Sequence, residues 1–152
     1  MKKVALGVGL TITILTGCVS SPQSQEREAS NSNLLSVEFV GNSSYKVPQQ
    51  QGTVRLYALE KRMADAPATL IQEKKVQVSQ IPFTVEFAIP QKHREHIQPA
   101  VKDNAELTYY VTWEADAANP VTKDTIMIDY DRQFPRVSLG AGKQQVLLRD
   151  RQ

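Results

Sequence analysis

Histidine often binds metals or transfers protons, and this chain has two histidines, His93 and His96, three residues apart. With a third ligand, the two imidazoles could hold a metal ion. Their segment, Gln91 to Gln98, lacks the HExxH pattern of zinc proteases, because Glu95 lies between the two histidines without the spacing that the pattern requires. Arg94 would also repel a cation. We therefore interpret the segment as a solvated polar turn and predict no metal site.

Asp129 and Asp131 form a second candidate pair, since two carboxylates on one strand face could perform glycoside hydrolysis. Carboxylates at a strand end beside Arg132 and Arg136 are more typical of surface ion pairs, which is the interpretation we adopt. No G-x-S-x-G motif accompanies the histidines, so serine chemistry has no support. We predict that the chain is not an enzyme, has no catalytic residue and binds no small-molecule substrate.

The glycine-rich segment Gly140-Ala141-Gly142-Lys143 has the composition of a phosphate-binding loop but not its pattern. It lacks G-x-x-x-x-G-K-[ST], and no helix can start after it. The segment predicts a hairpin turn. No cofactor is expected.

Cys18 is the only cysteine, which excludes an intramolecular disulfide and an all-cysteine metal site. It follows two lysines, Lys2 and Lys3, and an uncharged run from Val4 to Thr16. A positive start and a short apolar run are typical of a secretory signal peptide. The run is too short for a membrane span, which needs about 20 apolar residues.

The end of this run, Leu15-Thr16-Gly17-Cys18, resembles the lipobox of bacterial lipoproteins. The resemblance implies that a diacylglycerol alkylates the Cys18 thiol, that cleavage falls between Gly17 and Cys18, and that the new amino group is acylated. Several acyl chains anchor a protein stably. In this family an Asp after the cysteine signals retention in the inner membrane. Val19 therefore implies the outer membrane, with the protein body on the periplasmic face.

Charge argues against a nucleic-acid partner. The full chain has a formal net charge of +2. Removal of residues 1–17 removes Lys2 and Lys3 and no acid, so the mature charge falls to zero. The length of 152 residues and the 41% of hydrophobic residues fit one globular domain.

A polar segment separates the lipid from the body. Val19 to Asn33 has no aromatic residue, so it cannot bury enough surface to fold. We interpret residues 18–33 as the lipidated cysteine and a flexible tether with a span of roughly 20 Å. A short helix from Gln25 to Ala29 is the alternative.

From Leu34 onward, apolar residues alternate with polar ones, which is the pattern of β-strands. Turn residues separate the runs at short spacing. Residues 34–152 are therefore predicted to form one all-β sandwich of about seven to eight strands, with at most one short helix in 91–98. The predicted core consists of Val37, Phe39, Val54, Leu56, Leu70, Val76, Val78, Phe83, Val85, Phe87, Ile89, Ile97, Leu107, Tyr109, Val111, Trp113, Ile126, Ile128, Val137, Leu139, Val146 and Leu148.

Several segments resemble the YbaY/YscW group of envelope lipoproteins. Ala64 to Ile71 is similar to its ADAP segment, and Ile81 to Pro90 to its PF-x-F-x-LPY strand. His96 to Pro99 resembles its I-x-P element, Leu107 to Trp113 the strand that follows, and Asp124 to Ile126 a later strand opening. Together with the lipobox, the order and spacing of these segments cover roughly residues 50–148.

The chain also departs from this group at two places. Leu34 to Gly41 lacks the usual SGTV start, and the polar segment Asp116 to Lys123 replaces a short hairpin. The group includes pilotins, outer-membrane lipoproteins that bind the C-terminal tail of a secretin and promote its targeting and assembly in type III or type II secretion. It also includes YbaY-like members with a structural or stress-related role and no secretin client. A pilotin is the first hypothesis, a YbaY-like protein the alternative, and an envelope enzyme or glycan-binding lipoprotein the third.

A secretin tail would be an amphipathic segment that folds into an apolar groove. Apolar residues outside the core alternation are the candidates to line it, although such residues also occur singly on surfaces or under a second layer. The candidates are Leu59, Met63, Ile71, Tyr110, Met127 and Leu147.

Overall fold

The computed structural model describes residues 32–42, 45–63, 65–116 and 125–150. Within these ranges the chain forms eight β-strands and one short 3-10 helix, which confirms the predicted all-β class. The elements are β1 (Ser32–Val40), β2 (Tyr45–Glu60), β3 (Thr69–Ile81), β4 (Phe83–Pro90), η1 (Gln91–His96), β5 (Leu107–Ala115), β6 (Ile126–Ile128), β7 (Arg136–Val137) and β8 (Gln144–Asp150). Strand β1 begins two residues before the expected boundary at Leu34. No helix in the described ranges is long and apolar enough to span a membrane.

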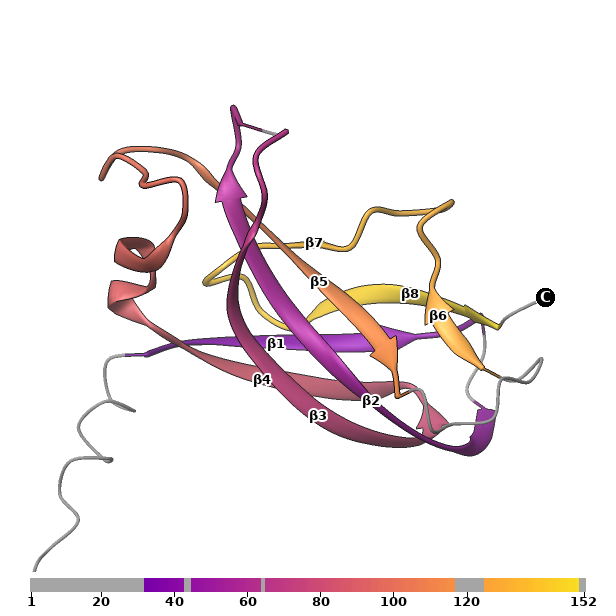
Figure 1. Ribbon diagram of the computed structural model, residues 1–152. Helices are drawn as coiled ribbons and strands as arrows, with labels where there is room; N and C mark the ends of the chain where they lie inside the picture. Colours follow the sequence, from indigo (N-terminus) through magenta and orange to yellow (C-terminus); the bar gives the residue numbers. More distant parts are fainter. Residues whose placement is uncertain (1–31, 43–44, 64, 117–124, 151–152) are drawn as a thin grey trace, which may run out of the picture.

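The strands form two four-stranded sheets, which confirms the sandwich. Their orders are β4-β1-β8-β6 and β3-β2-β5-β7. Figure 1 shows β2, β3 and β5 running diagonally across β1 and β4. All pairs are antiparallel except β1 with β8, which lie parallel from Val37 beside Gln144 to Val40 beside Leu147. We call the β3-β2-β5-β7 layer the second sheet.

Successive strands alternate between the two sheets at every connection except the β2–β3 hairpin. The expected hairpin turn at residues 140–142 is therefore wrong, because β7 belongs to the second sheet and β8 to the first. The Gln144 side chain stabilises this crossing by bonding the backbone of Ser138 at N–H and C=O, at 2.7 and 2.9 Å. Gly140 turns the chain there with a φ of +78°, which glycine adopts without a steric penalty.

The core lies between the sheets and follows the predicted alternation closely. Leu70 is the clear exception, because it is 45% exposed. A register shift in the β2–β3 ladder pairs Leu56 with Gln72 but Tyr57 with Leu70. The extra residue, Ile71, packs against the core, and Leu70 turns to the outer face. Four further residues predicted as core are only partly buried: Val76, Phe83, Leu107 and Leu139. Four buried hydrophobic residues were not predicted: Leu35, Val47, Ala58 and Ile81.

Aromatic rings join the two sheets inside this core. Phe39 of β1 stacks on Phe83 of β4 with ring centroids 4.8 Å apart, and Phe83 meets the edge of Trp113 of β5 at 5.9 Å. The indole N–H of Trp113 donates to the Ile126 carbonyl at 3.1 Å, which ties β5 to β6. Trp113 thus contacts both layers of the sandwich.

The short helix η1 carries the two histidines, and their environments differ. His93 is buried, with Nδ1 2.7 Å from the Pro90 carbonyl oxygen and Nε2 2.7 Å from the Tyr109 hydroxyl. His96 is exposed. The interpretation as a solvated polar turn is therefore wrong for His93, because one ring nitrogen bonds Pro90 at the end of β4 and the other bonds Tyr109 of β5. No group of three or more metal-ligating side chains occurs in the described ranges.

Candidate interaction surface

The predicted lipid-attachment residue Cys18 and cleavage residue Gly17 lie outside the described residues, as do nearly all of the tether and residues 117–124. Their proposed roles stay predictions. The predicted partner-binding residues can be placed, because all of them lie on described strands or turns.

Two of the predicted partner-binding residues lie close together on the outer face of the second sheet. Leu59 of β2 pairs with Thr108 of β5, and two residues along the same ladder Tyr57 pairs with Tyr110. Ala58 between them is completely buried, so Tyr57 and Leu59 point to the opposite, outer side.

The other predicted partner-binding residues do not join this pair in one groove. Met63 is 39% exposed in the turn after β2, and Ile71 packs against the core. Met127 and Leu147 are half-buried on β6 and β8 of the opposite sheet. The single groove that the six residues were expected to line is therefore not formed by the described residues.

Four aromatic rings gather instead on the outer side of the second sheet, and we call them the aromatic face: Tyr57, Tyr110, Tyr130 and Phe134. Tyr57 and Tyr110 stack with centroids 5.4 Å apart and planes at 17°. Phe134 lies 5.3 Å from Tyr110, and Tyr130 lies 6.5 Å from Phe134. Tyr130 and Phe134 remain 51% and 49% exposed. A continuous cluster of this kind at a surface is typical of an interaction site.

The strand alternation identified Tyr110 as a partner-binding candidate, and the same signal marks Tyr57, which was not predicted. Tyr57 and Tyr110 stand in the polar phase of their strands, between residues such as Arg55 and Thr112. Tyr130 follows Ile126 and Ile128 at the same two-residue spacing, so the alternation alone would place it on the inward side. Strand β6 ends at Ile128, and the turn that follows buries Asp129 and exposes Tyr130.

Charged groups border the aromatic face. The Arg136 guanidinium lies 5.7 Å from the centre of the Phe134 ring, a cation–π contact. Arg55, next in the outward phase to Tyr57, forms ion pairs with Glu73 at 3.1 Å and with Glu114. Arg55 is thus neutralised by its neighbours, whereas Arg136 makes no ion pair with any carboxylate of the described residues.

The hydroxyls of Tyr110 and Tyr130 stay neutral over a wide pH range. Burial raises the pKa of Tyr110 above its usual value of 10.0, and the nearby Tyr57 and Tyr130 raise it further. Burial also raises the pKa of Tyr130. The face therefore presents neutral rings, with Arg136 as the adjoining charge.

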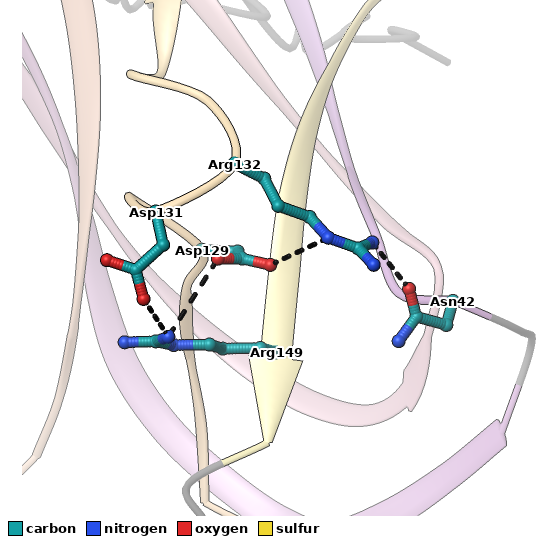
Figure 2. A network of polar contacts seen from close by, with 5 residues as sticks. All are labelled: Asn42, Asp129, Asp131, Arg132 and Arg149. Carbon is teal, nitrogen blue, oxygen red and sulfur yellow. Dashed lines mark hydrogen bonds and ion pairs between the residues drawn. The ribbon is translucent and has the colours of Figure 1, made fainter.

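A polar network supports the turn that presents Tyr130 and Phe134 (Figure 2). Asp129 lies between two guanidinium groups, 3.6 Å from Arg132 and 4.0 Å from Arg149. Arg149 also pairs with Asp131, and Arg132 donates to the Asn42 side chain at 2.9 Å. The predicted ion pairing of the two aspartates is confirmed. Their partners are Arg132, as expected, and Arg149 instead of Arg136.

A shallow groove of about 380 Å³ adjoins the aromatic face at Arg136. Its lining includes the side chains of Leu107, Thr108, Val137 and Leu139. Leu107, Val137 and Leu139 belong to the core side of the second sheet, so this groove lies at the β7 edge and does not extend the aromatic face.

No protein-family model matches the chain, and no curated protein matches its sequence. Among solved structures, the fold is similar to an alternative pilotin from the type II secretion system of Vibrio cholerae. That similarity covers 76% of this chain and 93% of the pilotin chain, with a TM-score of 0.48 and 17% sequence identity.

Proposed function

We propose that this chain is an outer-membrane lipoprotein that acts as a pilotin. In this role it binds the C-terminal tail of a secretin and promotes the targeting and assembly of the secretin ring. The observation that carries the proposal is the lipobox ending at Cys18 and followed by Val19, on a chain whose later segments resemble the YbaY/YscW group. Cys18 is the proposed site of lipid attachment, with the body on the periplasmic face.

The described strands are consistent with this assignment in one further respect. The segment that resembles the PF-x-F-x-LPY strand contains β4, and Leu107 to Trp113 lies within β5. Through Phe83 and Trp113 these two strands bring the two sheets into contact. The segments that carry the resemblance are therefore segments that build the sandwich.

We also propose that the protein is a binding module rather than an enzyme. The carboxylate most buried in the described residues, Asp129, is engaged by Arg132 and Arg149 and supports a turn. His93 bonds Pro90 and Tyr109 in the same structural manner. These groups serve the fold, and the outer aromatic face is the feature that remains for recognition.

Deleting the gene and replacing it with a Cys18→Ser variant tests the proposal. A serine hydroxyl is a poor nucleophile for lipid transfer, so the variant is expected to stay unlipidated and not to fractionate with the outer membrane. Secretin subunits should then accumulate in the inner membrane, although the variant still binds them. Heat-resistant secretin rings at normal levels in the deletion strain would refute the pilotin role and leave the YbaY-like alternative. Outer-membrane fractionation of Cys18→Ser would refute the lipid anchor.

A further inference from the structure

We infer that the aromatic face, with Arg136 at its border, is the docking site for an amphipathic segment that carries apolar side chains and a carboxylate. The inference rests on the proposed function, because it takes the tail of the secretin as that segment. It differs from the sequence expectation, which placed Ile71 and Met127 in the same groove as Tyr110.

Outward-facing residues are aligned across the strands of the second sheet. Leu70 of β3 pairs with Tyr57 of β2, Tyr57 pairs with Tyr110 of β5, and Tyr110 pairs with Arg136 of β7. The row therefore crosses all four strands of the sheet at right angles to their direction. Phe134 contacts both Tyr110 and Arg136, which fills the space beside the row.

The spacing of the strands matches the rise of a helix. Neighbouring strands lie about 4.8 Å apart, and a helix rises about 5.4 Å per turn. A helix laid across the strands would therefore place one apolar side chain near each strand for about three turns. This length, roughly ten residues, suits a short tail that becomes ordered on binding.

Arg136 offers a positive charge that a partner could complement. Arg55, Arg132 and Arg149 each have carboxylate partners within the described residues. Arg136 is exposed and has the Phe134 ring as its neighbour instead. Because the ring already orients the guanidinium, its N–H groups can bind a carboxylate of a partner with little loss of side-chain freedom. The occupant is therefore expected to place an acidic group at the Arg136 end of its apolar stripe.

A phospholipid surface fits these observations less well. Attraction to anionic headgroups needs several unpaired cations, whereas Arg55 beside the rings is neutralised by Glu73 and Glu114. Tyr57 and Tyr110 also stack on each other across two central strands rather than projecting from a loop. The observations thus favour a protein segment, and membrane contact becomes an outcome of the test.

The test measures binding of a synthetic peptide, the last few tens of residues of the secretin encoded in the same genome, to the purified Cys18→Ser chain. Tyr110→Ser and Phe134→Ser should each weaken binding by about 10-fold or more, as expected for aromatic anchors. Arg136→Glu should weaken it further by repelling the peptide carboxylate, and added salt should weaken binding to the parent chain more than binding to Arg136→Ala. Leu34→Ser, an exposed apolar residue of the other sheet, is the matched control and should bind normally.

The outcomes separate this inference from the proposed function. If the parent chain does not bind the peptide, the pilotin proposal fails together with the inference. If the parent binds but Tyr110→Ser, Phe134→Ser and Arg136→Glu bind equally well, the inference alone is overturned. It is also overturned if these variants instead lose binding to vesicles of phosphatidylethanolamine and phosphatidylglycerol, or change the oligomeric mass by sedimentation, with peptide affinity intact. Tyr110→Phe, which keeps the ring, should retain binding and controls for misfolding.

Discussion

Gly52 is the residue on which the packing of Trp113 depends. A Cβ atom at this position would lie 2.5 Å from the Glu114 carbonyl oxygen and 2.5 Å from the Trp113 ring. Real atoms do not approach so closely, and neither the β5 backbone nor a ring that also contacts Phe83 can move cheaply. Because glycine has no side chain, the β5 backbone and the Trp113 ring can both pack directly against β2 at this position.

Gly52→Ala should lower the free energy of unfolding by about 1–3 kcal/mol, the usual range for an overpacked core. Urea unfolding followed by circular dichroism measures the change. Gly142→Ala is the control, because no heavy atom of the described residues lies within 4 Å of its added Cβ. A control that loses as much stability as Gly52→Ala would show that loss of glycine flexibility, and not the contact with Trp113, causes the effect.

At the residue scale, the sequence indicated which interactions a side chain makes more reliably than whether that side chain is buried and which residues it contacts. The ion pairing of Asp129 and Asp131 was predictable from the nearby arginines, whereas the identity of Arg149 as a partner depends on β8 lying beside β6. The burial of His93 was not predictable, because its partner Tyr109 is distant in the sequence and also belongs to the core. Long-range contacts of this kind leave no local periodicity.

At the scale of elements, a parallel strand pair connects the two ends of the described chain. Strand β8 adds to β1 as its only parallel neighbour, and Glu38 of β1 binds Lys143 at 2.9 Å and Gln145 at 3.0 Å. Hydrogen bonds from Lys143 and Gln145 lower the pKa of Glu38 below its usual value of 4.5. The ionised carboxylate thus helps to hold β8 in register with β1.

The sign of the pH effect follows from this lowered pKa. The folded state binds the Glu38 proton less readily than the unfolded chain, so the contribution to stability is present above pH 4.5 and is lost as the pH falls through the folded pKa. Glu38→Gln should therefore reduce the loss of stability on acidification below that pH. Glu86→Gln, on the neighbouring strand β4, is the matched control, because Glu86 makes no ion pair with the described residues. Equal acid responses of parent and Glu38→Gln, measured by thermal unfolding, would contradict the role of Glu38.

Element periodicity predicted strand content well and strand pairing poorly. The alternation in Phe83 to Ile89 corresponds to β4 with Val85, Phe87 and Ile89 buried. In β3 the alternation predicted that Leu70 is buried, which is wrong. One extra residue, Ile71, reverses the inward and outward positions of the strand and exposes Leu70. A bulge has no signature in the apolar pattern of its own strand, so Leu70 was assigned to the core rather than to the surface where it borders Tyr57.

At the scale of the whole molecule, the alternation of successive strands between sheets makes the two layers interdependent. The chain crosses from one sheet to the other at Pro82, between β3 and β4, and again around η1. Because neither sheet is continuous in sequence, neither can form without the other. This topology could not be derived from the sequence pattern, which gives the faces of a strand but not its neighbours.

The sandwich should therefore unfold as one cooperative unit, and adjacent leucines on β1 provide the test. Leu35 is completely buried in the first sheet, whereas Leu34 is 60% exposed. Leu35→Ala should lower the free energy of unfolding by about 2–5 kcal/mol, and Leu34→Ala should change it by less than about 0.5 kcal/mol.

The decisive readout is Trp113, the only tryptophan, which is contributed by the second sheet. In Leu35→Ala its fluorescence transition should shift to lower urea together with the circular dichroism transition, since loss of the first sheet removes the Phe83 contact. A fluorescence midpoint that stays at the parent value while the dichroism midpoint falls would show that the sheets unfold separately and would refute this interdependence.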